Sequence, residues 1–214
     1  MNSRKELKSL YTANREAITR REARFARFLA CSSERRTFAE LAFCLLTPQS
    51  NALNCWAAVR DMRRNRVLFE GGAPEISNYI ACARFRNKKA EYIVSARDFF
   101  SGSGRISIKN HIEGFETPVS GREWLVKNIK GMGWKEASHF LRNVGRGEGL
   151  AILDRHILKN LESMGVIARV PGSLTGKAYL ATEDKMKKFA EDAGIPLNHL
   201  DLLLWFRETG KIFK

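Results

Sequence analysis

Apolar residues recur at three- and four-residue intervals along most of the chain, which is the spacing of amphipathic helices. In residues 4–32 an apolar stripe runs from Leu7 to Leu29, and the opposite face is rich in arginine. Residues 37–47 are apolar nearly all round, so they predict a buried, central helix. Pro48 then interrupts the pattern, which predicts a break between two helices.

The same periodicity continues to the end of the chain. It predicts helices at residues 52–62, 74–85, 87–100, 121–129, 134–144, 154–165, 177–194 and 195–210. Residues 101–110 are the only short stretch with strand character, and we interpret them as a loop. The predicted fold class is therefore all-α, with roughly ten helices of ordinary length.

The composition narrows the class of partner. The chain has 214 residues, 44% of them hydrophobic, which suffices for one large domain or two small packed ones. Lys and Arg number 37 against 23 Asp and Glu, a net charge of +14. Such a charge favours DNA, RNA or an anionic membrane surface, although a merely basic surface is the alternative. No apolar run reaches the ~18 residues of a spanning helix, so a membrane partner is not favoured.

The four cysteines are widely separated and form no Cys-x-x-Cys pair. They are Cys31, Cys44, Cys55 and Cys82. This spacing does not predict a zinc ribbon or a clustered set of iron–sulfur ligands. The polar N-terminus argues against a signal peptide. We therefore expect free thiols and a cytoplasmic location.

A glycine hairpin, Gly131-Met132-Gly133, separates two predicted helices. Its glycines permit a tight reversal, and the amides that start the second helix would face an anion such as a phosphate. Lys135 follows at the start of that helix, where an amine that has lost its proton can attack an electrophilic carbon and form a Schiff base. The alternatives are an ordinary helix–helix turn and a lysine that only contacts phosphate.

Asp154 follows the apolar residues 150–153 and precedes another helix, the position of an N-cap. A carboxylate fixed by helix amides could also stabilise positive charge at the anomeric carbon of a sugar. The residue pattern leaves capping and catalysis both open.

At these residues the sequence resembles the helix-hairpin-helix DNA glycosylase superfamily. The segments "IKGMGWKEA" and "ILDRHIL" match its hairpin, lysine and aspartate in order and spacing. The resemblance is closer to the compact 8-oxoguanine DNA glycosylase/AP lyases of archaea and thermophilic bacteria. It extends through "RNKKAEYIVSAR" and "LDLLLWFRETGKI" and so covers nearly the whole chain.

The resemblance implies a bifunctional base-excision repair enzyme. Lys135 would attack C1′ of a flipped 8-oxoguanine nucleotide in duplex DNA, Asp154 would support the cationic transition state, and β-elimination would nick the strand. Gly131, Gly133 and His156 would contact the DNA backbone. The carbonyls of three hairpin residues would bind Na⁺ or K⁺: Lys127, Ile129 and Met132. No other cofactor and no iron–sulfur cluster is implied.

Two loops and the tail also match family positions. Gln49 would fill the void left by the flipped base, and Phe85 would wedge into the stack with Arg84 or Arg86 near the estranged base. Lesion recognition would involve the C-terminal residue, Lys214, together with His139 and Trp205. A turn role for Gln49 and core roles for Phe85 and Trp205 are the alternatives.

The family pattern implies two helical lobes with a DNA-binding cleft between them. One lobe would span residues 32–153, and the other would combine residues 1–31 with 154–214. We expect a monomer that reaches the nucleoid through DNA binding. The rival hypotheses are a glycosylase for another oxidised base and a non-catalytic helix-hairpin-helix DNA-binding module.

Overall fold

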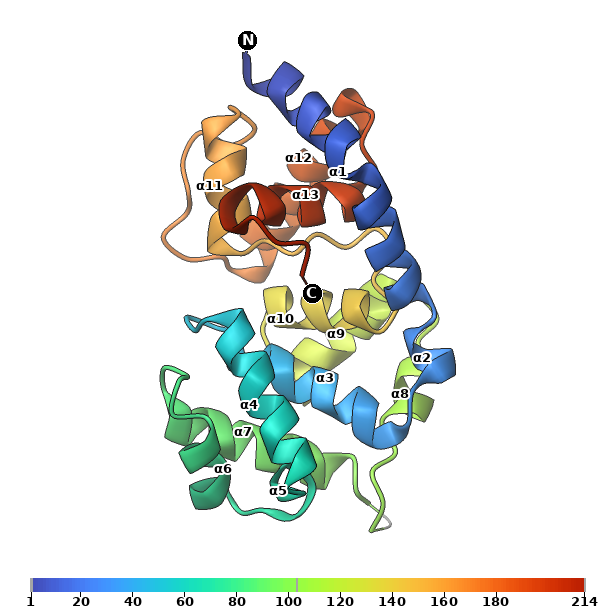
Figure 1. Ribbon diagram of the computed structural model, residues 1–214, viewed down its shortest axis with the longest axis vertical. Helices are drawn as coiled ribbons and strands as arrows, with labels where there is room; N and C mark the ends of the chain where they lie inside the picture. The colour runs from blue at the N-terminus through green and yellow to red at the C-terminus, as the bar shows by residue number, and fades with distance from the viewer. Residues whose placement is uncertain (1, 103, 214) are drawn as a thin grey trace. The chain divides into compact units, whose positions relative to one another are not determined.

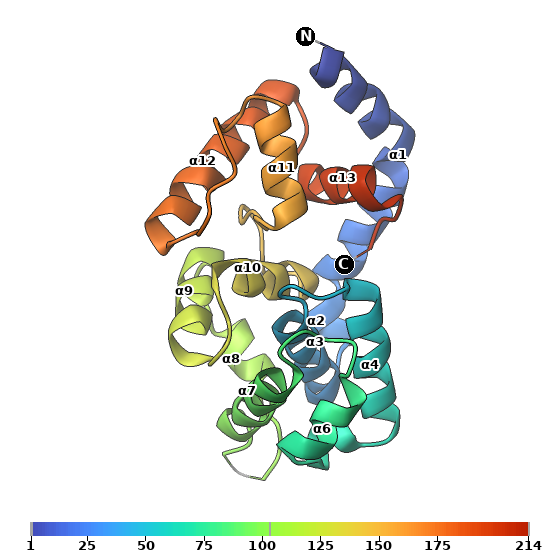
Figure 2. The same cartoon turned by 90° about the vertical axis from the view of Figure 1, so that its left-hand side faces the viewer.

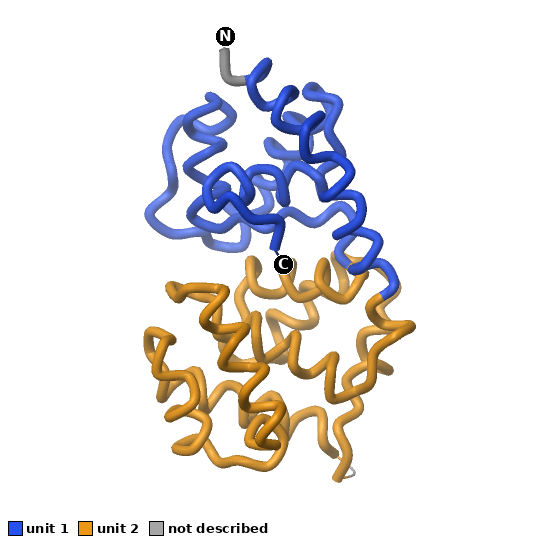
Figure 3. The backbone as a smooth tube through the Cα atoms, in the orientation of Figure 1, with its two compact units in different colours: residues 1–27, 147–214 blue, residues 28–146 orange. Residues whose placement is uncertain are grey.

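A computed structural model describes residues 2–102 and 104–213 of the protein, and this part of the chain is helical with no strand (Figure 1). The predicted all-α fold class is confirmed. The chain divides into two compact units (Figure 3). One is continuous in sequence, residues 28–146, and the other combines residues 1–27 with 147–214. No helix within the described residues is long and apolar enough to cross a membrane.

The continuous unit is built around α3 (Glu34–Leu46). Ser33 caps this helix, and every residue from Thr37 to Leu46 is buried, as its apolar pattern predicts. Around α3 pack α4 (Ala52–Arg64), α7 (Arg86–Phe99) and α10 (Trp134–Asn143) (Figure 1). The unit also contains α2 (Phe28–Cys31), α5 (Val67–Glu70), α6 (Ala73–Tyr79), α8 (Lys109–Glu113) and α9 (Pro118–Asn128).

The helix expected over residues 74–85 is shorter than its pattern suggests. It ends at Tyr79, and residues 80–85 form turns that lead into α7. The backbone of Phe85 adopts a left-handed conformation, with φ 59°, which no residue inside an α-helix can have. The turn therefore begins earlier than the expected junction at residues 85–87.

The discontinuous unit joins the two ends of the chain. Helix α13 (Leu197–Thr209) packs against α1 (Asn2–Ala26), α11 (Arg155–Ser163) and α12 (Gly176–Ala193), and it lies between α1 and α11 (Figure 2). Polar contacts reinforce this packing. His199 of α13 is hydrogen-bonded to Tyr11 and Glu22 of α1, both at 2.7 Å.

Candidate active site and nucleic-acid interface

The hairpin predicted at Gly131 joins α9 to α10. A capping box formed by Thr117 and Ser120 starts α9. The helix ends at Asn128, and the carbonyl of its C-cap residue, Ile129, accepts a hydrogen bond from Met132 N at 3.1 Å. The fully buried Arg122 joins the two helices, because its guanidinium bonds Ser138 Oγ at 3.3 Å and lies 5.0 Å from the centre of the Trp134 ring.

The two hairpin glycines differ in what they permit. Gly131 has a φ of +84°, and a β-carbon built on it would overlap the ring of Tyr92 in α7. Gly133 has extended backbone and caps α10 without any side-chain oxygen. The first amides of α10 therefore donate no hydrogen bond to an N-cap side chain, which is the arrangement that a phosphate ligand requires.

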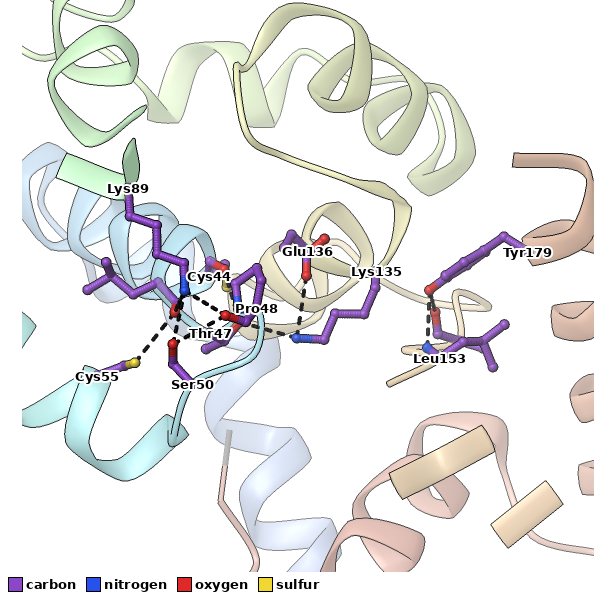
Figure 4. A network of polar contacts seen from close by, with 12 residues as sticks. Cys44, Thr47, Pro48, Ser50, Cys55, Lys89, Lys135, Glu136, Leu153 and Tyr179 are labelled. Atoms are coloured by element: carbon purple, nitrogen blue, oxygen red, sulfur yellow. Dashed lines mark hydrogen bonds and ion pairs between the residues drawn. The ribbon is translucent and has the colours of Figure 1, made fainter. Parts of the chain in front are cut away.

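Lys135 lies in the first turn of α10, and its side chain is 19% exposed. Its Nζ donates a hydrogen bond to Thr47 Oγ1 at 3.2 Å and lies 3.7 Å from the carboxylate of Glu136 (Figure 4). Thr47 is the C-cap of α3, so the amine is held against the end of the central helix. A partly buried amine with one hydroxyl partner is restrained yet still open to a substrate.

A second lysine, Lys89, contacts the segment around Thr47. Lys89 is buried, and burial lowers the pKa of its ammonium group, with the nearby charge of Lys135 contributing in the same direction. Cys55 donates a hydrogen bond from Sγ to Leu46 O at 3.5 Å, and burial raises the pKa of its thiol to about 11. Cys55 is therefore a neutral thiol at neutral pH.

Both residues expected to probe the base stack have strained backbones. Gln49 has a φ of 53° and Phe85 a φ of 59°, and both side chains are exposed. Phe85 is 59% exposed, so its ring does not occupy the core, and the guanidinium of Arg84 lies 4.9 Å from the ring centre. Arg86 is exposed at the start of α7. Left-handed non-glycine residues persist where their surroundings impose them, and they gather at functional sites.

Asp154 is the N-cap of α11, as its place in the sequence predicts. Its Oδ1 accepts a hydrogen bond from Ile157 N at 2.8 Å. The extended segment before it is held by helix α12. Tyr179 Oη donates to Ala151 O at 2.7 Å and accepts from Leu153 N at 3.2 Å (Figure 4). Glu183 accepts from Ala151 N at 2.7 Å. Ile157 N therefore holds the carboxylate of Asp154, and α12 holds the backbone that leads to it.

Three of the remaining expected residues lie in different settings. His156 lies edge-on to Trp205, with 5.3 Å between ring centres, and 3.7 Å from the carboxylate of Glu208. The indole nitrogen of Trp205 is buried and has no hydrogen-bond partner among residues 2–102 and 104–213. His139 is buried in the continuous unit, edge-on to Phe43 at 5.5 Å.

The C-terminal tail follows Gly210, which has a φ of 68° and ends α13. Ile212 O accepts a hydrogen bond from the guanidinium of Arg21 in α1 at 3.3 Å, so the tail is attached to the first helix. Lys214 lies outside the described residues.

The hairpin carbonyls expected to bind a monovalent cation come from the end of α9 and the turn after it. Uncharged carbonyl oxygens suit a hard cation of low charge, and the hydrogen bond that Ile129 O accepts still leaves it a second lone pair. The residues therefore fit a Na⁺ or K⁺ ion. Within residues 2–102 and 104–213, no group of three or more His, Cys, Asp or Glu side chains is arranged to hold a metal ion.

The sequence matches the family model described as 8-oxoguanine DNA glycosylase over residues 18–195. The chain belongs to this family. A relative from Fusobacterium nucleatum, an 8-oxoguanine DNA glycosylase/AP lyase, is 49% identical over 175 residues, which cover 82% of this chain and 81% of the relative.

Solved structures of the family share the fold. The 8-oxoguanine DNA glycosylase of Thermotoga maritima has 34% identity and a TM-score of 0.87, covering 100% of this chain and 99% of that one. The Methanocaldococcus jannaschii 8-oxoguanine glycosylase/lyase, in complex with DNA containing 8-oxoguanine, has 35% identity and a TM-score of 0.90, covering 100% of both chains.

The structure also shows residues at the site that the sequence pattern did not single out. Thr47, Ser50, Lys89, Tyr179 and Glu183 all make hydrogen bonds to segments that carry expected site residues. Their partners are 26 to 88 residues away along the chain. Helical periodicity carries no signal for such distant pairs, and only the burial of a lysine or glutamate in the fold reveals them.

Proposed function

We propose that the protein excises 8-oxoguanine from duplex DNA and nicks the resulting abasic site, in keeping with the family to which it belongs. Its role is base-excision repair. The position of Lys135 supports the lyase step most directly, since this partly buried amine begins the helix after the glycine hairpin and bonds Thr47 Oγ1. A module that only binds phosphates needs no restrained amine there, so this placement favours an enzyme.

The chemistry begins when Lys135 Nζ, having lost a proton to solvent, attacks C1′ of the damaged nucleotide. The bond from C1′ to the base breaks, and its electron pair leaves with the base, which takes up a proton. Opening of the sugar ring leaves a protonated Schiff base between C1′ and Nζ. Loss of a C2′ proton then expels the 3′ phosphate by β-elimination, and water hydrolyses the Schiff base to regenerate the lysine.

Asp154 stabilises the positive charge that develops at C1′ as the base departs. The hydrogen bond from Ile157 N and the support of Tyr179 and Glu183 hold this carboxylate in place before substrate binds. Preorganised charge of this kind lowers the barrier without reorganisation during the reaction. Capping α11 and stabilising the transition state are compatible roles for one carboxylate.

The target nucleotide must leave the stack, because C1′ is inaccessible inside a duplex. Phe85 enters the stack, Gln49 fills the vacated space, and Arg84 and Arg86 bind near the estranged base. Gly131, Gly133 and His156 contact the backbone phosphates. A Na⁺ or K⁺ ion on the carbonyls of Lys127, Ile129 and Met132 would add a positive charge there.

Three residues are assigned to recognition of the oxidised base. Lys214, Trp205 and His139 are the proposed residues. Trp205 is the best supported of them, because its buried indole N–H has no acceptor within the described part of the chain, and such a group calls for one. The proposed reaction steps use only side chains and water. We expect a monomer that acts in the cytoplasm on nucleoid DNA.

The decisive experiment compares Lys135→Gln with Lys188→Gln, an exposed lysine on α12. Duplexes would carry either 8-oxoguanine or a single oxidised pyrimidine. Lys135→Gln should lose strand nicking and covalent trapping by borohydride while keeping duplex affinity, and Lys188→Gln should keep all three. A trapped complex with Lys135→Gln would exclude this lysine as the nucleophile. Faster release of the pyrimidine than of 8-oxoguanine by the unaltered protein would assign another lesion.

A further inference from the structure

The two strained residues Gln49 and Phe85 come from different segments, yet one side chain ties the segments together. Lys89 is 4% exposed, and its ammonium donates hydrogen bonds to Leu46 O at 2.7 Å, Pro48 O at 2.6 Å and Ser50 Oγ at 3.0 Å (Figure 4). An ammonium has three N–H donors, so all of them are used. The acceptors lie on both sides of Gln49.

Ser50 carries the connection from the Gln49 segment to the Phe85 turn. Its hydroxyl donates to Pro48 O at 3.2 Å and accepts both from Lys89 Nζ and from Arg84 N, each at 3.0 Å. A hydroxyl has one donor and two acceptor positions, and Ser50 uses all of them. Arg84 is the residue before Phe85, and its backbone is therefore fixed to the segment that contains Gln49.

Lys89 is also joined to Phe85 through the backbone. Its amide donates to Phe85 O at 3.0 Å, which forms the first turn of α7. The same residue thus begins the helix behind Phe85 and reaches across to the Gln49 segment with its side chain. Thr47, within that segment, bonds Lys135 at 3.2 Å. Ser50 N donates to Thr47 O at 3.1 Å, so hydrogen bonds link the proposed nucleophile to the residues that flank Gln49 and to the backbone of Phe85.

A buried ammonium is a costly way to join two segments if stability alone is required, since an apolar contact would serve as well. A buried ammonium is suitable, however, if the backbone carbonyls around Gln49 must keep their positions when the duplex contacts both loops. We propose that Lys89 is a positioning residue that holds Gln49 and Phe85 as one rigid unit, so that both enter the duplex together when the damaged nucleotide is extruded. This inference rests on the proposed function.

Lys89 should affect extrusion of the nucleotide and not the chemical steps that follow it. Extrusion is needed for 8-oxoguanine paired with cytosine, whereas a preformed abasic site opposite a gap needs little or none. Misplacement of binding groups by about 1 Å can cost on the order of 10²-fold in rate. Loss of the Lys89 tie should therefore slow reactions of paired 8-oxoguanine strongly and leave reactions of the unpaired abasic site almost unchanged.

The test uses Lys89→Met, which keeps the length of the side chain and removes its donors. Lys88→Met is the matched control, because Lys88 is exposed and pairs with Glu91 on the surface. Single-turnover rates would be measured on 8-oxoguanine opposite cytosine, on 8-oxoguanine opposite an abasic analogue, and on a preformed abasic site opposite a gap. Lys89→Met should lose about 10²-fold on the first substrate and less than about threefold on the last. An equal loss on all three, or no loss on the first, would overturn the proposal.

A second readout does not depend on catalysis. Amide hydrogen exchange at Arg84 should become faster in Lys89→Met and in Ser50→Ala, because each variant weakens the hydrogen bond that protects this amide. Ser50→Ala removes no charge, so it serves if Lys89→Met folds poorly. Unchanged exchange at Arg84 would show that Lys89 and Ser50 do not hold the two segments together. Inactivity of the unaltered protein on 8-oxoguanine would instead refute the proposed function, and with it the role in extrusion.

Discussion

The amine of Lys135 lies 3.2 Å from Thr47 Oγ1, and the hydroxyl of Thr47 donates its own proton to Cys44 O at 3.0 Å. The direction of both hydrogen bonds is therefore fixed, with Thr47 accepting from the lysine. The threonine closes the C-terminal end of α3, so the proposed nucleophile takes its position from the most buried helix of its unit.

Thr47→Val should slow Schiff-base formation because it removes the acceptor that restrains Lys135 without changing the shape of the side chain. Hydrogen bonds to charged groups contribute about 1.5–3 kcal/mol, so we expect a loss of roughly 10- to 100-fold in the rate of borohydride trapping. Thr47→Ser, which retains the hydroxyl, is the control. Equal trapping rates for the valine and serine variants would show that the contact has no part in the reaction.

Asp154→Asn separates capping from catalysis. Asparagine caps a helix about as well as aspartate, so the free energy of unfolding should change by only a few tenths of a kcal/mol. Loss of the charge should slow base release by roughly 10²–10³-fold. Thermal melting and single-turnover base release would be measured on the same preparation. Normal turnover would leave Asp154 as a helix cap alone.

Tyr179→Phe should loosen the segment that carries Asp154. It leaves Ala151 O and Leu153 N without their buried hydrogen-bond partner, at a cost of about 1–3 kcal/mol. Tyr11→Phe is the matched control, because it also removes a partly buried hydrogen bond of a tyrosine hydroxyl, the one with His199, in the same unit. Both variants should melt earlier, but only Tyr179→Phe should also slow base release at a temperature where both are folded. Equal activity in the two variants would contradict a positioning role.

The hairpin glycines provide a paired test of stability. Gly131→Ala forces a left-handed alanine and a clash with Tyr92, which together cost about 2–5 kcal/mol. In Gly133→Ala the new β-carbon meets the flexible carboxylate of Glu136 at 2.8 Å, so we expect a cost of about 1 kcal/mol or less. Urea denaturation of both variants gives the comparison. A smaller loss for Gly131→Ala than for Gly133→Ala would contradict the packing seen at Tyr92.

The sequence predicted those parts of the molecule that depend on neighbouring residues. The all-apolar pattern of residues 37–47 indicated a central helix, and the position of Asp154 before a helix indicated an N-cap, since both signals are local. Lys89 shows the limit of this approach. It stands beside Lys88 in the same basic stretch, yet one is buried and the other exposed, because the acceptors of Lys89 come from 39 to 43 residues away.

The positions of aromatic side chains were also beyond local patterns. Phe85 and His139 both belong to segments of helical periodicity, but Phe85 is exposed at a left-handed turn and His139 packs against Phe43. Which face of a helix meets the core depends on its neighbours in three dimensions. A single helix does not specify this when apolar residues occupy more than one of its faces.

Helix α1 depends on α13, and this dependence sets an order for synthesis. The contacts of Tyr11 and Glu22 with His199, and of Arg21 with Ile212, all require the last part of the chain. At about 5–20 residues per second, roughly 10–40 s pass between the emergence of α1 from the ribosome and the emergence of those partners. Residues 28–146 are complete well before that time, so we expect them to fold first. During this interval the apolar stripe of α1 has no partner helix, and we expect the basic face of α1 to keep it soluble.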